Sequence, residues 1–195
     1  FKDPFDTKDI RSTGGGDAAY DMDFPARDHV LVDQLRAKGA IIFAKAVNTE
    51  YNGRAGDPGG RHTPDKVLPS TLGYQRSTWA GNPSNPYDTS RSASLGSSSG
   101  SALSVSANLV MASLGEETRA STRGPSNHNA VALILPHKAM LGFDGGAIGA
   151  DIYCDRSGIH ARRLGDCAKI LDALKDSENG YYDPRDVYTT VPRSS

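Results

Sequence analysis

The sequence has few cysteines and no long apolar run. Its 195 residues include only two cysteines, Cys154 and Cys167, which can form at most one disulfide and cannot by themselves build a zinc cluster. The uninterrupted apolar runs at 40–44 and 130–135 have five and six residues. A membrane-spanning helix needs roughly 20. The sequence therefore predicts neither a membrane span nor a metal site made of cysteines.

An excess of either charge is also absent. Lys and Arg together number 22 and Asp and Glu number 23, which gives a net charge of −1. Affinity for nucleic acids comes mainly from clustered cations that neutralise phosphates, so this balance argues against a nucleic-acid partner. The 21 glycines and 11 prolines make the chain rich in turns. Amphipathic and apolar segments nevertheless persist along it, which argues against intrinsic disorder.

A helix followed by a strand is predicted near the N-terminus. We expect the helix over 23–38, because Asp23 can cap it, Pro25 suits its first turn and Gly39 can end it. The run 40–44 is short, apolar and rich in β-prone residues, which fits a buried strand. A helix that leads into a buried strand favours an α/β fold with a wound sheet.

Two further helices and one irregular region are expected downstream. Small residues line a helix predicted at 100–108 and permit close packing, and an apolar stripe predicts a helix over 164–174. Glycine and proline are frequent from 52 to 86, too frequent for long regular elements. This part of the chain is therefore predicted to be a long irregular excursion.

A serine-rich segment precedes the helix predicted at 100–108. Residues 92–101 read SASLGSSSGS, a composition typical of a flexible linker. Because the segment runs directly into a helix, its free backbone N–H groups can instead hold an anion or an oxyanion. Residues 96–100 also match G-x-S-x-G, the nucleophile elbow of α/β-hydrolases, with Ser98 as nucleophile. The elbow interpretation is the weaker one, because the preceding residues are polar and turn-like rather than an apolar strand.

A second serine-containing segment, LGEETRASTRGP at 114–125, is typical of a polar loop when taken alone. Together, the two segments resemble the paired motifs of the amidase signature family, a G-S-S-G-G-S loop followed by a helix and then by G-T-D-x-G-G-S-[IV]-R-x-P. Ser97 falls on the family's bridging serine and Ser121 on its nucleophile. Their separation, 121 − 97 = 24, is the family's own interval. Arg123 and Pro125 fall on the family's Arg and Pro.

The resemblance extends in order over nearly the whole chain. Lys2 and Asp3 match the Lys-Asp pair that contains the family's catalytic lysine. Residues 37–45 resemble the helix end and strand that lead to the family's G-K-T-N, and 82–92 resemble its N-P-x-D-x-x-R-S approach to the serine loop. Residues 155–162 resemble D-T-V-G-P-M-A-R. Each match is weak alone, but the ordered set is specific.

The resemblance implies hydrolysis of amides by a Ser–cis-Ser–Lys triad. Ser121 would attack a carbonyl carbon, and Ser97 would pass the proton of Ser121 to Lys2. For this the lysine must be neutral, a form that burial favours by lowering its pKa. The resemblance also implies a cis peptide bond at Ser97, which costs about 3 kcal/mol in a residue other than proline.

An oxyanion hole is implied as well, formed by the backbone N–H groups of Thr118, Arg119, Ala120 and Ser121. The family usually has glycine where this chain has Arg119 and Ala120. Arg119 and Ser98 are candidates for substrate binding. Two alternatives stay open, an amidotransferase subunit with the same chemistry and a catalytically inactive binding module of the same fold.

No metal or cofactor is predicted. Lys45 matches a family lysine outside the triad, and we expect it to be structural. Four histidines lie scattered without the spacing of metal ligands, so surface or packing roles are expected for them. These are His62, His128, His137 and His160.

The implied fold is α/β, with a mixed β-sheet core flanked by helices on both faces. We expect residues 1–195 to form the N-terminal and central part of one amidase signature domain, with a loop insertion at about 52–72. The predicted partners are a small-molecule amide substrate and either the remainder of the domain or a second polypeptide, with a homo-oligomer as a further option.

Overall fold

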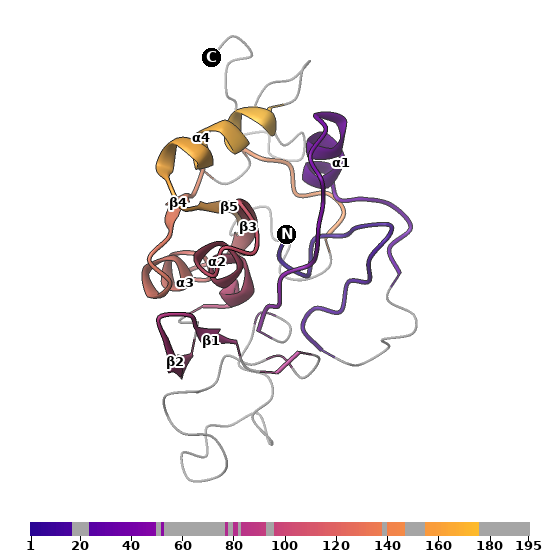
Figure 1. Cartoon of the computed structure of the whole chain (residues 1–195). Coiled ribbons are helices and arrows are strands. Elements are labelled where there is room, and N and C mark those ends of the chain that lie inside the picture. The colour runs from indigo at the N-terminus through magenta and orange to yellow at the C-terminus, as the bar shows by residue number, and fades with distance from the viewer. Residues whose placement is uncertain are drawn as a thin grey trace.

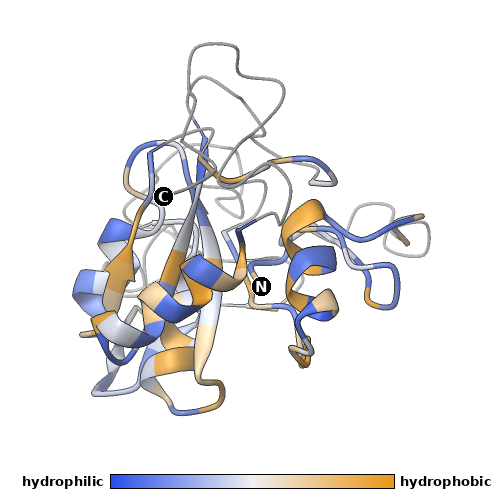
Figure 2. Ribbon diagram, turned by 90° about the horizontal axis from the view of Figure 1, so that it is seen from above, coloured by the Kyte–Doolittle hydropathy of each residue, from blue (hydrophilic) through white to orange (hydrophobic). Residues whose placement is uncertain are grey.

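The computed structural model describes residues 1–16, 24–49, 52, 77, 80–81, 83–92, 96–137, 140–146 and 155–175. Four helices and five strands lie in these ranges. Figure 2 shows hydrophilic and hydrophobic residues alternating along the helices, as expected of amphipathic helices at the surface of a core. Among the residues described, no helix is long and apolar enough to cross a membrane.

Three strands form the main sheet, in the order β3, β5, β4. Strand β5 (Arg156–Ala161) is central and pairs antiparallel with both β3 (Ala112–Glu117) and β4 (Ala132–Ile134). The α/β prediction is confirmed. In the described residues, however, this sheet is antiparallel, and parallel pairing is limited to the single bridge between Lys2 and Ala46.

Helix α4 (Leu164–Ala173) covers one face of this sheet. Its Cys167 packs in one apolar core with Ile159 of β5 and Leu114 of β3, which lie opposite each other in the register. Because successive side chains of a strand point to opposite faces, Ile159 and Leu114 define the α4 face. The prediction of a helix near 164–174 is confirmed.

The opposite face of the sheet holds α2 (Ser99–Ser106) and α3 (Arg123–His128), which lie side by side, apart from α4 (Figure 1). On this face, the His160 imidazole of β5 hydrogen-bonds the Ser126 hydroxyl of α3 at 2.9 Å. Gly158 of β5 lies against the side chain of Thr122, just before α3. Helices therefore cover both faces, as predicted, and the helix expected at 100–108 is confirmed, although it starts one residue earlier and ends two residues earlier.

The first helix is shorter than predicted. Helix α1 covers Val30–Ala37, and the His29 side chain caps it by accepting a hydrogen bond from Leu31 N at 3.1 Å. Residues 24–29 are not helical, so the predicted start was wrong, and the proposed cap Asp23 lies outside the described residues. The helix ends as predicted, because Gly39 adopts a φ of +86° that side chains disfavour.

The run 40–44 is not the buried strand that its apolar character predicted. Ile41 is 89% exposed and Phe43 is 73% exposed. In the described part of the chain no strand lies beside it, and pairing begins only at Ala46, which bridges Lys2. Without a neighbouring strand, Ile41 and Phe43 have no sheet to pack into and face solvent, whereas the partly buried Ile42 packs against the apolar core.

A short hairpin of β1 (Ser84–Asn85) and β2 (Asp88–Ser92) falls in the region predicted to be irregular or turn-like. Its turn is closed by Tyr87 N, which donates to Asn85 Oδ1 at 2.8 Å. This corrects the prediction for that part of the chain. The loop insertion predicted at 52–72 lies outside the described residues, apart from Asn52.

Candidate active site

Lys2 is fixed against strand β3. Its backbone N–H donates to Leu114 O at 2.7 Å, while Asp3 N donates to Ala46 O at 2.8 Å, so the N-terminal segment is tied on two sides. The Lys2 side chain is fully buried. Its Nζ donates to Ser97 Oγ at 2.8 Å, and to Glu116 at 2.6 Å to Oε2 and 3.3 Å to the carbonyl oxygen.

The surroundings of Lys2 act on its protonation in opposite directions. Burial lowers the pKa of Lys2, whereas the neighbouring Glu116 carboxylate favours the charged ammonium form. Burial also raises the pKa of Glu116, which Lys2 opposes. For each group the effect of burial is the larger one. The lowered pKa of Lys2 is the direction that the proton relay requires.

The serine loop lies between Lys2 and the segment that contains Ser121. Ser97 is buried, and its carbonyl oxygen accepts a hydrogen bond from Thr49 N at 3.0 Å. Ser98 N donates to Ser121 O at 2.9 Å. The Ser98 hydroxyl is fully buried and bonded to the backbone of Glu116, donating to the carbonyl at 2.9 Å and accepting from the N–H at 3.2 Å. This hydroxyl therefore fastens the loop to β3.

Gly96 brings the serine loop into direct contact with the Ser121 segment. A Cβ atom at Gly96 would lie 2.5 Å from Ala120 O and 2.8 Å from Ser121 Cα. Only glycine fits at this separation. Ser97 is thus flanked by two residues that touch Ser121 or its neighbour, and its hydroxyl meets Lys2. The structure therefore joins Ser97 to Lys2 by a hydrogen bond and places the backbone of Ser121 against the same loop.

The peptide bonds of residues 96–98 are trans, and no cis bond occurs among the described residues. The predicted cis bond at Ser97 was therefore wrong. The trans backbone already directs Ser97 Oγ to Lys2 Nζ, so the hydrogen bond at 2.8 Å forms without a cis link and its cost.

Glu117 holds the turn that follows Ser121. Its Oε2 accepts hydrogen bonds from Thr122 N at 2.8 Å and Arg123 N at 2.9 Å, and its Oε1 accepts from Arg123 Nε at 2.6 Å. Burial raises the pKa of Glu117, but the bonds from Arg123 and Thr122 outweigh burial and hold it below its usual value. The half-buried Ser121 therefore sits next to a turn clamped by a carboxylate.

The residues predicted for the oxyanion hole form an exposed bend between β3 and Ser121. Thr118, Arg119 and Ala120 are all solvent-exposed. Neither Arg119 nor Ala120 adopts a positive φ, so replacing the family's glycines here requires no left-handed backbone. The Arg119 side chain faces solvent, whereas Lys2, Ser97 and Glu116 are buried.

Two carboxylates were missed as functional residues, because the sequence around them is typical of a solvated charge run. Glu116 and Glu117 are both buried, at 1% and 0% exposed. Since they are consecutive residues of β3, their side chains leave opposite faces, one toward Lys2 and one toward Arg123. The sequence did contain a signal for Glu116. When the family pattern is aligned on Ser121, Glu116 stands where the pattern has Thr.

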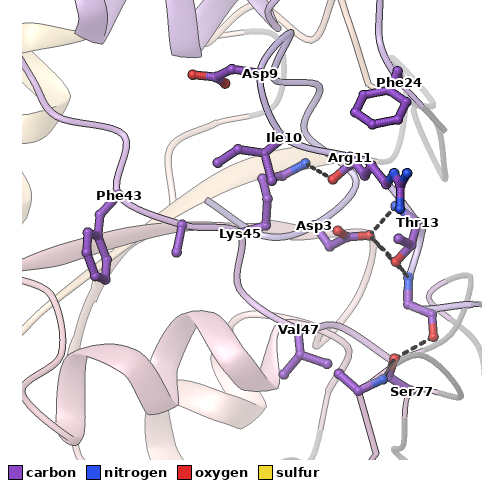
Figure 3. Close-up of a pocket in the computed structure, with 13 residues that line it drawn as sticks. Asp3, Asp9, Ile10, Arg11, Thr13, Phe24, Phe43, Lys45, Val47 and Ser77 are labelled. Carbon is purple, nitrogen blue, oxygen red and sulfur yellow. Dashed lines mark hydrogen bonds between the residues drawn. The ribbon is translucent and has the colours of Figure 1, made fainter. Parts of the chain in front are cut away.

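A cavity of about 580 Å³ lies beside the Lys2 segment, but none of the three triad candidates lines it (Figure 3). Asp3 lines it and accepts hydrogen bonds from Thr13 N at 2.9 Å and Thr13 Oγ1 at 3.0 Å. Lys45 donates to Arg11 O at 3.3 Å and to Ser12 Oγ at 3.0 Å, and burial lowers its pKa to about 8. These contacts fit the structural role expected of Lys45.

The described residues contain no group of three His, Cys, Asp or Glu side chains placed to hold a metal ion. His160 is completely buried against α3, and burial lowers its pKa to about 3, so the imidazole is neutral. This confirms the packing role predicted for His160.

Comparison with known proteins shows which family the chain resembles. The family model described as Amidase matches residues 1–194. A protein of Arabidopsis thaliana named as a probable amidase is 35% identical over 189 residues, covering 97% of this chain and 33% of that protein. A mitochondrial glutamyl-tRNA(Gln) amidotransferase subunit of Anopheles gambiae is 31% identical, covering 89% of this chain and 32% of that protein.

Solved structures also include amidases that resemble this chain. The native peptide amidase of Stenotrophomonas maltophilia superposes with a TM-score of 0.73 at 30% identity, covering 91% of this chain and 33% of that one. The chain thus spans about a third of the length of these relatives. With a family match over 1–194 and the fold of a solved amidase, the chain belongs to the amidase signature family.

Proposed function

We propose that this chain carries the catalytic serines and lysine of an amide hydrolase, which cleaves a linear carboxamide to a carboxylic acid and ammonia or an amine. The observation that supports this most directly is the buried hydrogen bond of 2.8 Å from Lys2 Nζ to Ser97 Oγ, in a loop that touches Ser121. A hydroxyl becomes a nucleophile when a neighbouring base removes its proton. Lys2 is that base in the proposed reaction, and Ser97 connects it to Ser121.

In the proposed mechanism, Ser121 Oγ attacks the carbonyl carbon of the amide. The Ser121 proton moves to Ser97 while the Ser97 proton moves to the neutral amine of Lys2, so that each step breaks one bond to hydrogen and forms one. Backbone N–H groups of the bend at 118–121 stabilise the oxyanion. The proton then returns along the same route to the departing nitrogen, which leaves an acyl-serine. Water hydrolyses this ester and regenerates Ser121.

We propose that the complete enzyme needs polypeptide beyond the part described. The chain spans about a third of its relatives, and the exposed apolar residues Ile41 and Phe43 lie in a segment without a neighbouring strand in the described ranges. The remainder of the domain, or a second polypeptide, would cover this surface and contribute to the substrate site. A homo-oligomer is the other way to cover it.

An amidotransferase subunit is the second candidate function. It is favoured by the 31% identity to a glutamyl-tRNA(Gln) amidotransferase subunit. The chemistry at the serine is the same, but the ammonia passes to an acceptor instead of leaving. Ammonia release in the absence of ATP and of any partner protein separates the two, because only the hydrolase predicts it.

A panel of aryl, aliphatic and ureido amides tests the proposal on the whole protein, including any sequence outside these 195 residues. We expect ammonia or amine release from at least one class, and loss of that release in Ser121→Ala at unchanged thermal stability. If the folded wild-type protein hydrolyses none of them, and no partner restores activity, the chain is a binding module that kept the fold.

A further inference from the structure

Glu116 is an unusual neighbour for a lysine that has to act as a base. The Glu116 side chain is 2% exposed and the Lys2 side chain 0%, and Oε2 lies 2.6 Å from Nζ. The same Oε2 accepts a second hydrogen bond, from Asn52 Nδ2 at 2.8 Å. The family pattern has Thr at the position of Glu116.

The geometry makes Glu116 compete with Ser97 for the Lys2 amine. A protonated Lys2 donates its three hydrogens to the three acceptors around Nζ, namely Ser97 Oγ, Glu116 Oε2 and the Glu116 carbonyl. If the proton between Nζ and Oε2 moves to the carboxylate, the Glu116 O–H points back at the nitrogen lone pair. In the first arrangement the electron pair of Nζ forms an N–H bond, and in the second it accepts a hydrogen bond from Glu116. In neither arrangement can Nζ accept the proton of Ser97.

We propose that Glu116 holds Lys2 in this occupied state and thereby sets the pH at which the serine relay becomes active. The proposal rests on the function proposed above. The activating step is the loss of the proton that the pair shares: an N–H or O–H bond breaks, the proton leaves to solvent, and the pair changes from a net charge of 0 to −1. Lys2 then donates to the carboxylate and turns its lone pair to Ser97.

The other titratable groups around Lys2 and Glu116 either oppose the loss of the shared proton or are neutral. Asp155 and Glu117 both favour the ammonium form of Lys2, and Asp155 also raises the pKa of Glu116, so both disfavour the extra negative charge that activation creates. His160, on the other face of the sheet, is a neutral imidazole, and the charge of Lys2 contributes to lowering its pKa. Asn52 is the group that stabilises the anionic carboxylate after the proton has left, through its hydrogen bond at 2.8 Å.

The alternative is that Glu116 only fills space and fixes Lys2. Glu116→Gln separates the two, because glutamine keeps the size and an oxygen acceptor but carries no charge and takes no proton. Lys2 then loses the carboxylate that raises its pKa. We expect the acid limb of the pH profile for Ser121 labelling by a fluorophosphonate to move to lower pH, and labelling at pH 7 to rise about tenfold or more.

The control is Asp144→Asn, which removes a carboxylate charge at an exposed ion pair with Arg27 and leaves the Lys2 cluster intact. We expect its pH profile to match that of the wild type. If Glu116→Gln fails to fold, Glu116→Thr, which has the residue of the family pattern, takes its place. The proposal would be overturned if the acid limb of the labelling profile stayed in place in a folded Glu116 variant. It would also be overturned if the limb moved by the same amount in Asp144→Asn.

A second readout does not depend on catalysis. The Lys2 methylene next to Nζ can be followed by NMR in the whole protein with ¹³C-labelled lysine as pH is varied, with Lys2→Met assigning the signal. We expect Lys2 to titrate at lower pH in Glu116→Gln than in the wild type. If no serine is labelled at any pH but this shift appears, the proposed hydrolase fails, and only the effect of Glu116 on the protonation of Lys2 stands. If labelling occurs but Lys2 titrates identically in both proteins, the proposed hydrolase stands and the proposed role of Glu116 fails.

Discussion

The amino group of Lys2 donates a hydrogen bond of 2.8 Å to the hydroxyl of Ser97, across 95 positions of the sequence. Strand β3 makes this contact possible, because Leu114 O binds the backbone of Lys2 and Glu116 binds both the Lys2 amine and the Ser98 hydroxyl. One strand thus fixes the base and the loop that carries the bridging serine.

Replacement of Lys2 by methionine should abolish function and also destabilise the fold. It removes the proposed base, and general-base catalysis typically contributes roughly 10²–10⁴-fold. It also leaves the buried Glu116 carboxylate without its cation, which costs about 3–5 kcal/mol. Chemical denaturation and the rate of serine labelling measure the two effects. In Lys2→Met combined with Glu116→Gln, stability should largely recover while labelling stays lost; recovery of both would remove Lys2 from the mechanism.

Gly96→Ala should disturb the site, because the added methyl group would lie 2.5 Å from Ala120 O and 2.8 Å from Ser121 Cα. Backbone must move to accommodate it, at about 1–3 kcal/mol in the free energy of unfolding and with loss of activity. Gly165→Ala is the matched control, since nothing lies within 4 Å of its added methyl group. Equal stability and activity in the two variants would show that the two loops do not touch as described.

Glu117 should contribute stability that is lost in acid. Hydrogen bonds from Thr122 and Arg123 hold its folded pKa below the ordinary value of 4.5, so the folded state keeps the carboxylate ionised longer than the unfolded state does. This contribution is complete above pH 4.5 and is lost as pH falls through the folded pKa. Urea unfolding of wild type and Glu117→Gln from pH 7 to pH 3 should show the difference in stability shrinking with acid. A constant difference would mean that the carboxylate charge does not clamp the turn.

The α/β fold class could be predicted from the sequence, and residues for a site could be proposed from it. Ser97, Ser121 and Lys2 could be proposed as a triad because the chain contains short motifs with fixed spacing, and the spacing of 24 between the serines is independent of tertiary structure. The helices near 100 and 164 followed from local patterns of small and apolar residues. These features depend on neighbours in the sequence, which a single sequence contains.

Several of the errors involve partners distant in the sequence. The run 40–44 has the composition of a buried strand, but burial requires a neighbouring strand, and the described residues supply none. His29 caps α1 in place of the expected Asp23, because its imidazole is held among Phe5 and Phe143. Glu116 looked like part of a solvated charge run, since only the fold places Lys2 against it.

The most direct test of the account is to map the site of fluorophosphonate modification by mass spectrometry in the whole protein. The account predicts one adduct on Ser121, absent in Ser121→Ala and formed much more slowly in Ser97→Ala and Lys2→Met. An adduct on Ser98 instead, or a Ser121 adduct that forms equally fast without Lys2, would contradict the proton relay from Ser121 through Ser97 to Lys2.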